Sequence, residues 1–274
     1  MQQHLQAFRE ELINKMKELT MGKVVKLEDV QVLLSDSVRI RDRSRVEDMV
    51  NSLVRGGKEK LQMISDFDRT LTKQHVNGKP TLSSFCIFSQ CRQLPSGYKE
   101  QDAALFQHYR PIEIDPNISR EEKAKHMVDW YQQAQKLLRG FDFQTEELEE
   151  VIRREGAELR EGTDKMLQSL QAAGVPVLVF SAGLGDSVSA VLRYHNVLFS
   201  NVHIISNYLR FDGLQVNGFQ GDIIHSFNKN EHAIEKSDYF QVEDRLEEFL
   251  KHFDIVLIDD QTMDIVNGIL DLVP

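Results

Sequence analysis

Apolar runs alternate with helical patterns along most of this chain. Residues 175–180 form an unbroken apolar run, and shorter runs occupy 202–205 and 255–258. A fully apolar run between helices is typical of a parallel strand buried on both faces. Apolar residues spaced three or four apart predict helices at 45–53 and 163–173. The alternation predicts an α/β fold, a doubly wound and mostly parallel sheet.

Residues 79–156 have a different sequence pattern, with few runs of β-branched residues. Ser119 and Glu122 form a capping box that predicts a helix to about residue 140, and Thr145 begins another. We expect a helical cap at 79–156, inserted into a core of residues 37–78 and 157–274. An amphipathic pattern at 2–20 predicts a helix in an N-terminal extension of residues 1–36. Farther along the chain, glycines among alternating apolar positions at 208–227 predict a β-hairpin.

Polar residues follow three of the predicted strands. Asp66 and Asp68 end the run at 61–65, Ser181 ends the run at 175–180, and Asp259-Asp260 ends the last one. Ligands of open α/β sheets bind beyond the carboxyl ends of the strands. One such end alone is equally typical of an acidic turn, but three together favour an active site.

These residue types suit the hydrolysis of a phosphate ester. Asp66 can attack phosphorus and bind a metal ion, while Asp68 can donate and accept protons. The Ser181 hydroxyl and the Lys229 ammonium can neutralise phosphoryl oxygens. Taken singly, Lys229 reads as a solvated lysine and Ser181 as a helix cap; their order along the chain favours the catalytic interpretation.

Charge and cysteine content narrow the functional class. The net charge of −10, without a basic block, argues against binding to a nucleic acid polymer. Two cysteines are too few for a disulfide framework, which favours a reduced cytoplasmic compartment. No apolar run reaches the roughly 18 residues of a membrane span, and the early Glu10 and Glu11 do not suit a targeting peptide. We expect a cytoplasmic protein without membrane attachment.

Several motifs closely resemble the cytosolic 5′-nucleotidase III family of the haloacid dehalogenase superfamily, which has a Rossmann-like core and a cap. They are ISDFD at 64–68, PIEIDP at 111–116, MVDWY at 127–131, FSAGLGD at 180–186, ISNY at 205–208 and IIHSFNK at 223–229. The resemblance implies a Mg²⁺-dependent 5′-nucleotidase whose substrates are nucleoside 5′-monophosphates such as 7-methyl-GMP and CMP. It also implies an aspartyl-phosphate intermediate and a monomer.

The resemblance assigns roles to individual residues. Asp66 resembles the nucleophile and Asp68 the proton donor, both with a share in binding Mg²⁺. The phosphate-binding set is matched by Ser181, Ala182 and Lys229, and the nucleobase-binding set by Glu113, Phe85 and Tyr131.

The chain departs from the family at two places. Arg69 stands where the family usually has methionine, beside the acid pair. After residues 239–241 the family has a strand and a Gly-Asp turn that completes the metal site, and this segment is missing here. Asp260 (or Asp259) replaces the lost metal ligand if residues 255–258 take the vacant sheet position. Otherwise the chain is a catalytically impaired form that binds nucleotides. A third alternative is a phosphotransferase, which differs from the hydrolase only in that phosphate is transferred to a nucleoside and not to water.

Overall fold

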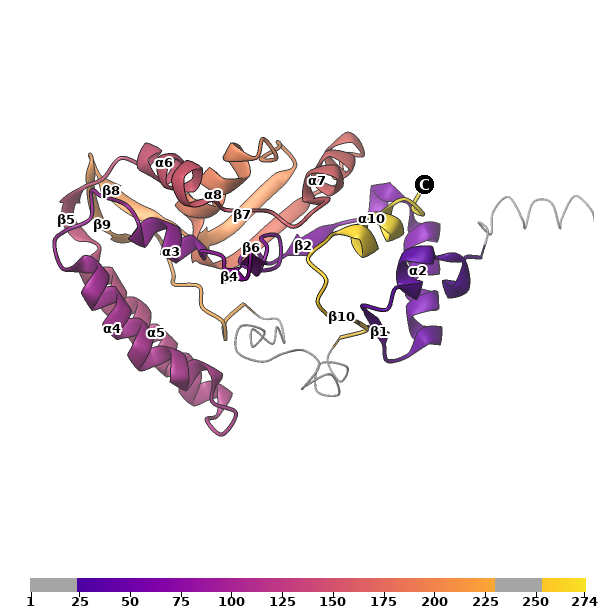
Figure 1. Cartoon of the computed structure of the whole chain (residues 1–274), viewed down its shortest axis with the longest axis horizontal. Coiled ribbons are helices and arrows are strands. Elements are labelled where there is room, and N and C mark those ends of the chain that lie inside the picture. Colours follow the sequence, from indigo (N-terminus) through magenta and orange to yellow (C-terminus); the bar gives the residue numbers. More distant parts are fainter. Residues whose placement is uncertain (1–23, 230–252) are drawn as a thin grey trace, which may run out of the picture.

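The centre of the molecule is a parallel sheet of three strands. The computed structural model describes residues 24–229 and 253–274. In the sheet, β2 (Met63–Ser65), β6 (Val177–Leu184) and β7 (Val202–Asn207) lie in the order β2–β6–β7. Ile64 lies opposite Leu178, and Val179 opposite Ile204. The predicted α/β class is confirmed, and the motifs that end β2 and β6 meet at one edge of this sheet (Figure 1).

Helices cover one face of the sheet. On the other face Ile64 and Ile205 are 60% and 47% exposed, so the expectation that these strands are buried on both faces is wrong for β2 and β7. Helix α7 (Thr163–Ala172) leads into β6, and α8 (Gly185–Tyr194) leads from β6 toward β7. Their inward residues, such as Leu167 and Val188, are fully buried in the main hydrophobic cluster. The start of α8 packs tightly against a ring, because a Cβ on Gly185 would lie 2.6 Å from Tyr208. Close packing therefore fixes where α8 leaves the sheet edge.

The segment predicted as a cap is mostly helical, but not entirely. Its elements are α3 (Ser84–Ser89), α4 (Tyr98–Ile114), α5 (Arg120–Leu137), β5 (Arg139–Asp142) and α6 (Glu146–Glu155). Helices α4 and α5 form the long hairpin of Figure 1, and Ser119 caps α5 by accepting from the Glu122 N–H at 3.2 Å. Strand β5 corrects the all-helical expectation. A short, largely exposed strand has no apolar pattern, and it forms only by pairing.

The partner of β5 is the predicted β-hairpin, which is confirmed. Strand β8 (Leu209–Asp212) pairs with β9 (Gln215–Phe219), and β9 pairs with β5 to give the order β5–β9–β8. In this register Asp142 lies opposite Gln215. The cap and the hairpin that follows β7 are thus joined by one small sheet.

A second hydrophobic cluster lies at the other end of the molecule. It is built from η1 (Leu27–Asp29), η2 (Gln31–Leu34), β1 (Val38–Ile40), α2 (Arg43–Gly56), β10 (Ile255–Leu257) and α10 (Asp264–Leu270). Strand β10 pairs antiparallel with β1, with Val38 opposite Leu257. This pairing contradicts the idea that the last strand takes a position beside β2.

The remaining short elements are η3 (Lys58–Lys60), β3 (His75–Val76) and β4 (Lys79–Pro80). The helix expected at 2–20 lies outside the described residues. Among the helices of residues 24–229 and 253–274, none has the length and apolar character of a membrane span.

Candidate active site

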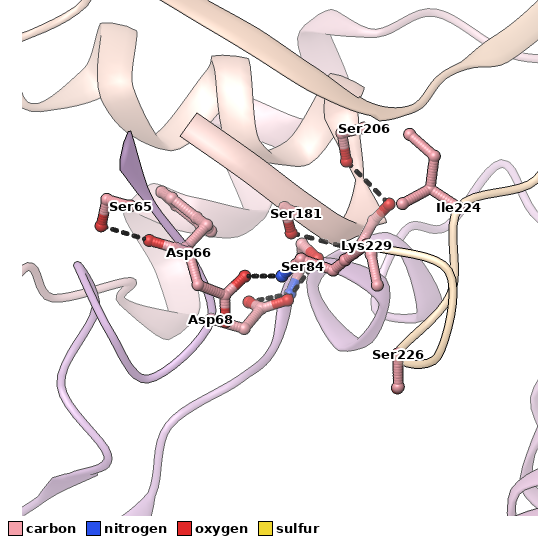
Figure 2. A network of polar contacts seen from close by, with 12 residues as sticks. Ser65, Asp66, Asp68, Ser84, Ser181, Ser206, Ile224, Ser226 and Lys229 are labelled. Atoms are coloured by element: carbon pink, nitrogen blue, oxygen red, sulfur yellow. Dashed lines mark hydrogen bonds and ion pairs between the residues drawn. The ribbon is translucent and has the colours of Figure 1, made fainter. Parts of the chain in front are cut away.

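Asp66 and Lys229 form an ion pair across 163 positions of sequence. Asp66 directly follows β2, and its Oδ1 accepts a hydrogen bond from Lys229 Nζ at 2.8 Å. The Lys229 side chain is 3% exposed, whereas that of Asp66 is 32% exposed. Figure 2 shows the lysine reaching the carboxylate from the segment after β9. The buried cation meets an acid that solvent can still reach, which suits a carboxylate that must contact a charged substrate.

Asp68 is held by Ser84 at the start of the cap. Ser84 N donates to Asp68 Oδ1 at 2.8 Å, and Ser84 Oγ donates to Oδ2 at 2.7 Å. Burial raises the pKa of Asp68 to about 6, and the negative charge of Asp66 adds to the rise. The two bonds from Ser84, and the charge of Arg69, oppose it. The raised pKa brings the protonated form of Asp68 closer to neutral pH than an ordinary carboxyl group would allow, which suits a general acid.

The residue after the acid pair has a strained backbone. Arg69 has a φ of 63°, in the left-handed region that side chains other than glycine seldom adopt. Its N–H donates to Thr72 Oγ1 at 2.7 Å, and its carbonyl accepts from Arg160 Nη2 at 3.0 Å. These bonds hold the sharp turn that carries Asp68 back toward the sheet edge.

Ser181 lies at the end of β6 with an oriented hydroxyl group. It is 1% exposed, and its Oγ accepts a hydrogen bond from Gly183 N at 3.0 Å. A Cβ on Gly183 would lie 2.0 Å from Ser84 Oγ and 2.8 Å from Asp68 Oδ2. Only glycine therefore lets the end of β6 approach the acid pair so closely.

The end of β6 is also bonded to the cap. Tyr131 Oη, on α5, donates to the Ala182 carbonyl at 2.7 Å. The same carbonyl accepts from Asn207 Nδ2, at the end of β7, at 2.8 Å. Ala182, expected in the phosphate-binding set, thus lies at a junction between the cap and the core.

Three aromatic rings line the cap side of this junction. The ring of Phe85 lies 5.9 Å from that of Tyr131 and 6.1 Å from that of Phe219, with edge-to-face geometry. Phe219 is a further member of the set that the sequence did not single out. Rings of this kind offer faces on which a nucleobase can stack.

Glu113 lies between the cap and the loop that precedes Lys229. Its carboxylate accepts from Arg110, one helical turn back on α4, and from the hydroxyl of Ser226. The side chain of Glu113 is 10% exposed. Both carboxylate oxygens are bonded, so a base that binds to Glu113 must exchange with Ser226 or share the acceptor.

The hydrogen bonds of the Asp260 carboxylate lead to Thr262 and Ser37. Its Oδ1 accepts from the N–H and the hydroxyl of Thr262, at 2.7 and 2.8 Å, and its Oδ2 accepts from Ser37 Oγ at 3.3 Å. These contacts tie β10 to the N-terminal elements. The sheet position that a replacement metal ligand required is not the one that β10 occupies.

Asp66 and Asp68 have the donor chemistry of a magnesium site. Mg²⁺ prefers oxygen ligands and is often held by one or two carboxylates together with substrate phosphate and water. Asp66 is partly exposed and offers such an oxygen beside Asp68. Within the described part of the chain, no group of three or more His, Cys, Asp or Glu side chains is arranged around a metal site. The pair fits Mg²⁺, but as a minimal set of ligands.

Two buried polar residues hold the site together without having been predicted. Ser84 binds both oxygens of Asp68, and Asn207 is 1% exposed and bonds to two loops. Asn207 lies within a motif that resembles the family, but its type and spacing say nothing about its partners. Nothing in the sequence around Ser84 indicates its bonds to Asp68.

Comparison with known proteins identifies close relatives. The family model of pyrimidine 5′-nucleotidase (UMPH-1) matches residues 69–242 and 240–274. The 7-methylguanosine phosphate-specific 5′-nucleotidase of Drosophila melanogaster is 38% identical, over 94% of this chain and 93% of the relative. That of Homo sapiens is 36% identical, over 89% and 94%. The crystal structure of cytosolic 5′-nucleotidase IIIB bound to cytidine has a TM-score of 0.85 and 36% identity, over 91% of this chain and 97% of that one.

The same comparisons locate a deletion. The two matched pieces of the family model meet at residues 240–242, after the segment that resembles the lysine motif. The Drosophila alignment has 299 positions, although 94% of this chain is only about 258 residues. About 40 positions of the alignment therefore have no residue of this chain. Both observations agree with the loss of a family segment after residues 239–241 that the resemblance implies.

Proposed function

Because the chain belongs to the pyrimidine 5′-nucleotidase (UMPH-1) family, a family of phosphoric monoester hydrolases, we propose that it hydrolyses nucleoside 5′-monophosphates. The substrates proposed are 7-methyl-GMP and pyrimidine nucleotides such as CMP. The observation that carries the proposal is the convergence of Asp66, Lys229 and Asp68 at the end of β2, where Lys229 lies 2.8 Å from Asp66. We expect the protein to act as a monomer in the cytosol.

The chemistry follows from the positions of the two acids. A carboxylate oxygen of Asp66 attacks phosphorus, and the bond from phosphorus to O5′ breaks while Asp68 gives its proton to that oxygen. Asp68 then takes a proton from a water molecule, which attacks the aspartyl-phosphate. This second step releases inorganic phosphate and restores Asp66.

The phosphoryl oxygens need positive charge and hydrogen-bond donors. Lys229 supplies a buried ammonium group. Ser181 accepts from Gly183, so its own hydroxyl hydrogen is directed elsewhere and can be donated to a phosphoryl oxygen. Mg²⁺, held by Asp66 and Asp68, would add charge neutralisation when bound.

The nucleoside would lie against the cap. Phe85, Tyr131 and Phe219 supply ring faces, and Glu113 supplies an acceptor for base N–H groups. A methylated guanine carries a positive charge, which favours aromatic faces and a carboxylate still further.

A second candidate function is a catalytically impaired form that binds nucleotides. Two observations favour it: the missing family segment, and the exposure and incomplete pairing of β2 among the described strands. Ile64, in the middle of β2, is 60% exposed, and β2 pairs only with β6 among the described strands. A strand at the centre of a parallel sheet is normally covered on both sides. A site with two carboxylates is expected to bind Mg²⁺ weakly and to turn over slowly.

Phosphate release from CMP and 7-methyl-GMP, measured over a series of Mg²⁺ concentrations, separates the two candidates. The hydrolase predicts release that rises with Mg²⁺ and is abolished in Asp66→Asn. Nucleotide binding without release at any Mg²⁺ concentration would support the impaired form. Full activity in Asp66→Asn would exclude Asp66 as the nucleophile, and transfer to an added nucleoside would indicate a phosphotransferase.

A further inference from the structure

The carbonyl group of Ala182 accepts hydrogen bonds from both the cap and the core. Tyr131 Oη approaches it at 2.7 Å from α5, and Asn207 Nδ2 at 2.8 Å from the end of β7. A carbonyl oxygen has two lone pairs, so these two donors use its full capacity. The orientation of the Ala182–Gly183 peptide is therefore set by two side chains from different parts of the fold.

Asn207 also joins this peptide to the segment that leads to Lys229. Its Nδ2 donates to the Ile224 carbonyl at 2.8 Å, and its Oδ1 accepts from the Ile224 N–H at 2.8 Å. A longer bond of 3.2 Å reaches the Gly183 carbonyl. The side chain is 1% exposed, so water does not compete for these bonds. One buried amide thus connects the end of β6 with the loop before the lysine, its Nδ2 bonding to both segments and its Oδ1 to the loop.

The orientation of the peptide matters for Ser181. In a peptide group the N–H points opposite to the carbonyl, and here the N–H is that of Gly183, which donates to Ser181 Oγ at 3.0 Å. If the Ala182 carbonyl turned, that donor would turn with it. The direction of the Ser181 hydroxyl therefore depends on Tyr131 and Asn207, although neither touches Ser181 in the bonds described here.

We propose that Asn207 and the hydroxyl of Tyr131 are positioning residues for the phosphate subsite, which they hold by fixing the Ala182–Gly183 peptide. The ring of Tyr131 lies 5.9 Å from Phe85 and 6.3 Å from Phe219, on the nucleobase side. The two parts of Tyr131 thus have separate tasks, since the ring faces the base and the hydroxyl sets the phosphate loop. This inference rests on the proposed function, because it assumes that phosphate binds at the end of β6.

The separation of tasks can be tested with Tyr131→Phe, which removes the hydroxyl and keeps the ring. Binding of inorganic phosphate and of cytidine is measured separately by calorimetry on the full chain, with Mg²⁺ and with EDTA. We expect phosphate to bind roughly three- to tenfold more weakly, from the loss of one buried hydrogen bond. Cytidine affinity is expected to stay within about twofold. Tyr194→Phe, an exposed tyrosine at the end of α8, is the matched control.

Three results with Tyr131→Phe would count against the proposal. Unchanged phosphate binding would show that the hydroxyl does not position the subsite. Weaker cytidine binding with phosphate binding retained would show that Tyr131 acts through the nucleobase alone. Equal loss of both affinities would indicate a general change of the cap, and would also count against it.

Asn207 provides the second arm of the test. Asn207→Asp cannot donate to the Ala182 and Ile224 carbonyls and adds a negative charge, so phosphate binding is expected to fall more than about tenfold. The thermal midpoint of each variant is recorded. In the double variant with Tyr131→Phe, the loss of the hydroxyl should cost less than it does alone, because both side chains act on one carbonyl. Strictly additive effects would contradict a shared action, and if Asn207→Asp fails to fold, Tyr131→Phe still decides.

The controls separate this inference from the proposed function. A wild-type chain that binds neither phosphate nor cytidine would overturn both. A wild-type chain that binds both ligands, with variants that bind phosphate equally well, would overturn only the positioning role.

Discussion

Replacing Asp68 with asparagine is expected to stabilise the metal-free protein, and more strongly at neutral than at acidic pH. The carboxyl group is removed from water, and this burial, together with the charge of Asp66, raises its pKa to about 6 from an ordinary value of 3.8. Asparagine has nearly the same shape and no charge. Its carbonyl can accept from Ser84 N, and its amide can donate to Ser84 Oγ, so both bonds to Ser84 are retained.

The sign follows from the direction of the shift. A raised pKa means that the folded state binds the proton more tightly than the unfolded state, so ionisation destabilises the fold. The penalty begins as the pH passes about 3.8 and is complete above about 6. At about 1.4 kcal/mol for each pKa unit, the cost approaches about 3 kcal/mol at pH 7.5 and is about 1.6 kcal/mol at pH 5. Asp68→Asn removes this cost.

The assay is urea unfolding in EDTA at pH 5 and pH 7.5, with the free energy of unfolding extrapolated to water. The advantage of Asp68→Asn over wild type should grow by about 1.4 kcal/mol between the two pH values. Asp48→Asn, on an exposed position of α2, controls for the loss of one negative charge. An advantage that stays constant or shrinks as the pH rises would refute the argument that burial of Asp68 dominates.

Three further substitutions test the site. Gly183→Ala places a Cβ 2.0 Å from Ser84 Oγ, so it should lower the free energy of unfolding by about 1–3 kcal/mol in urea titrations and abolish phosphate binding; retained binding would show that the loop yields. Asp260→Ala should leave Mg²⁺ affinity, measured by calorimetry, unchanged while costing about 1–3 kcal/mol through the bonds to Thr262; weaker Mg²⁺ binding would contradict the structural role. Lys229→Met should weaken CMP binding at least about tenfold, because a charged contact to phosphate is lost; an unchanged CMP affinity would remove Lys229 from the subsite.

The pattern of apolar and polar residues was sufficient to predict the main helices and strands. The apolar runs at 175–180 and 202–205 became β6 and β7, and the capping box at Ser119 begins α5. Asp66 and Lys229, expected to act together, form an ion pair. These features were predictable because apolar runs and helix caps depend on residues close in sequence.

Elements that depend on a distant partner were not predictable. Strand β5 has no apolar pattern and exists because β9 pairs with it. The position of β10 was left open by sequence, since the same four apolar residues suit an edge beside β2 or beside β1. Pairing with β1 determines the position of β10. Asp260, which follows β10, is therefore placed where its carboxylate bonds to Ser37 and Thr262.

The sequence by itself determined the chemistry that is available: two acids at the end of one strand, a serine at the end of the next, and a lysine after the hairpin. Tertiary structure alone decided how these groups are held. Ser84, Asn207 and the hydroxyl of Tyr131 act through buried hydrogen bonds between segments 16 to 51 positions apart. Such bonds are set by where the backbone carbonyls and amides come to rest, and neither spacing nor residue type encodes that.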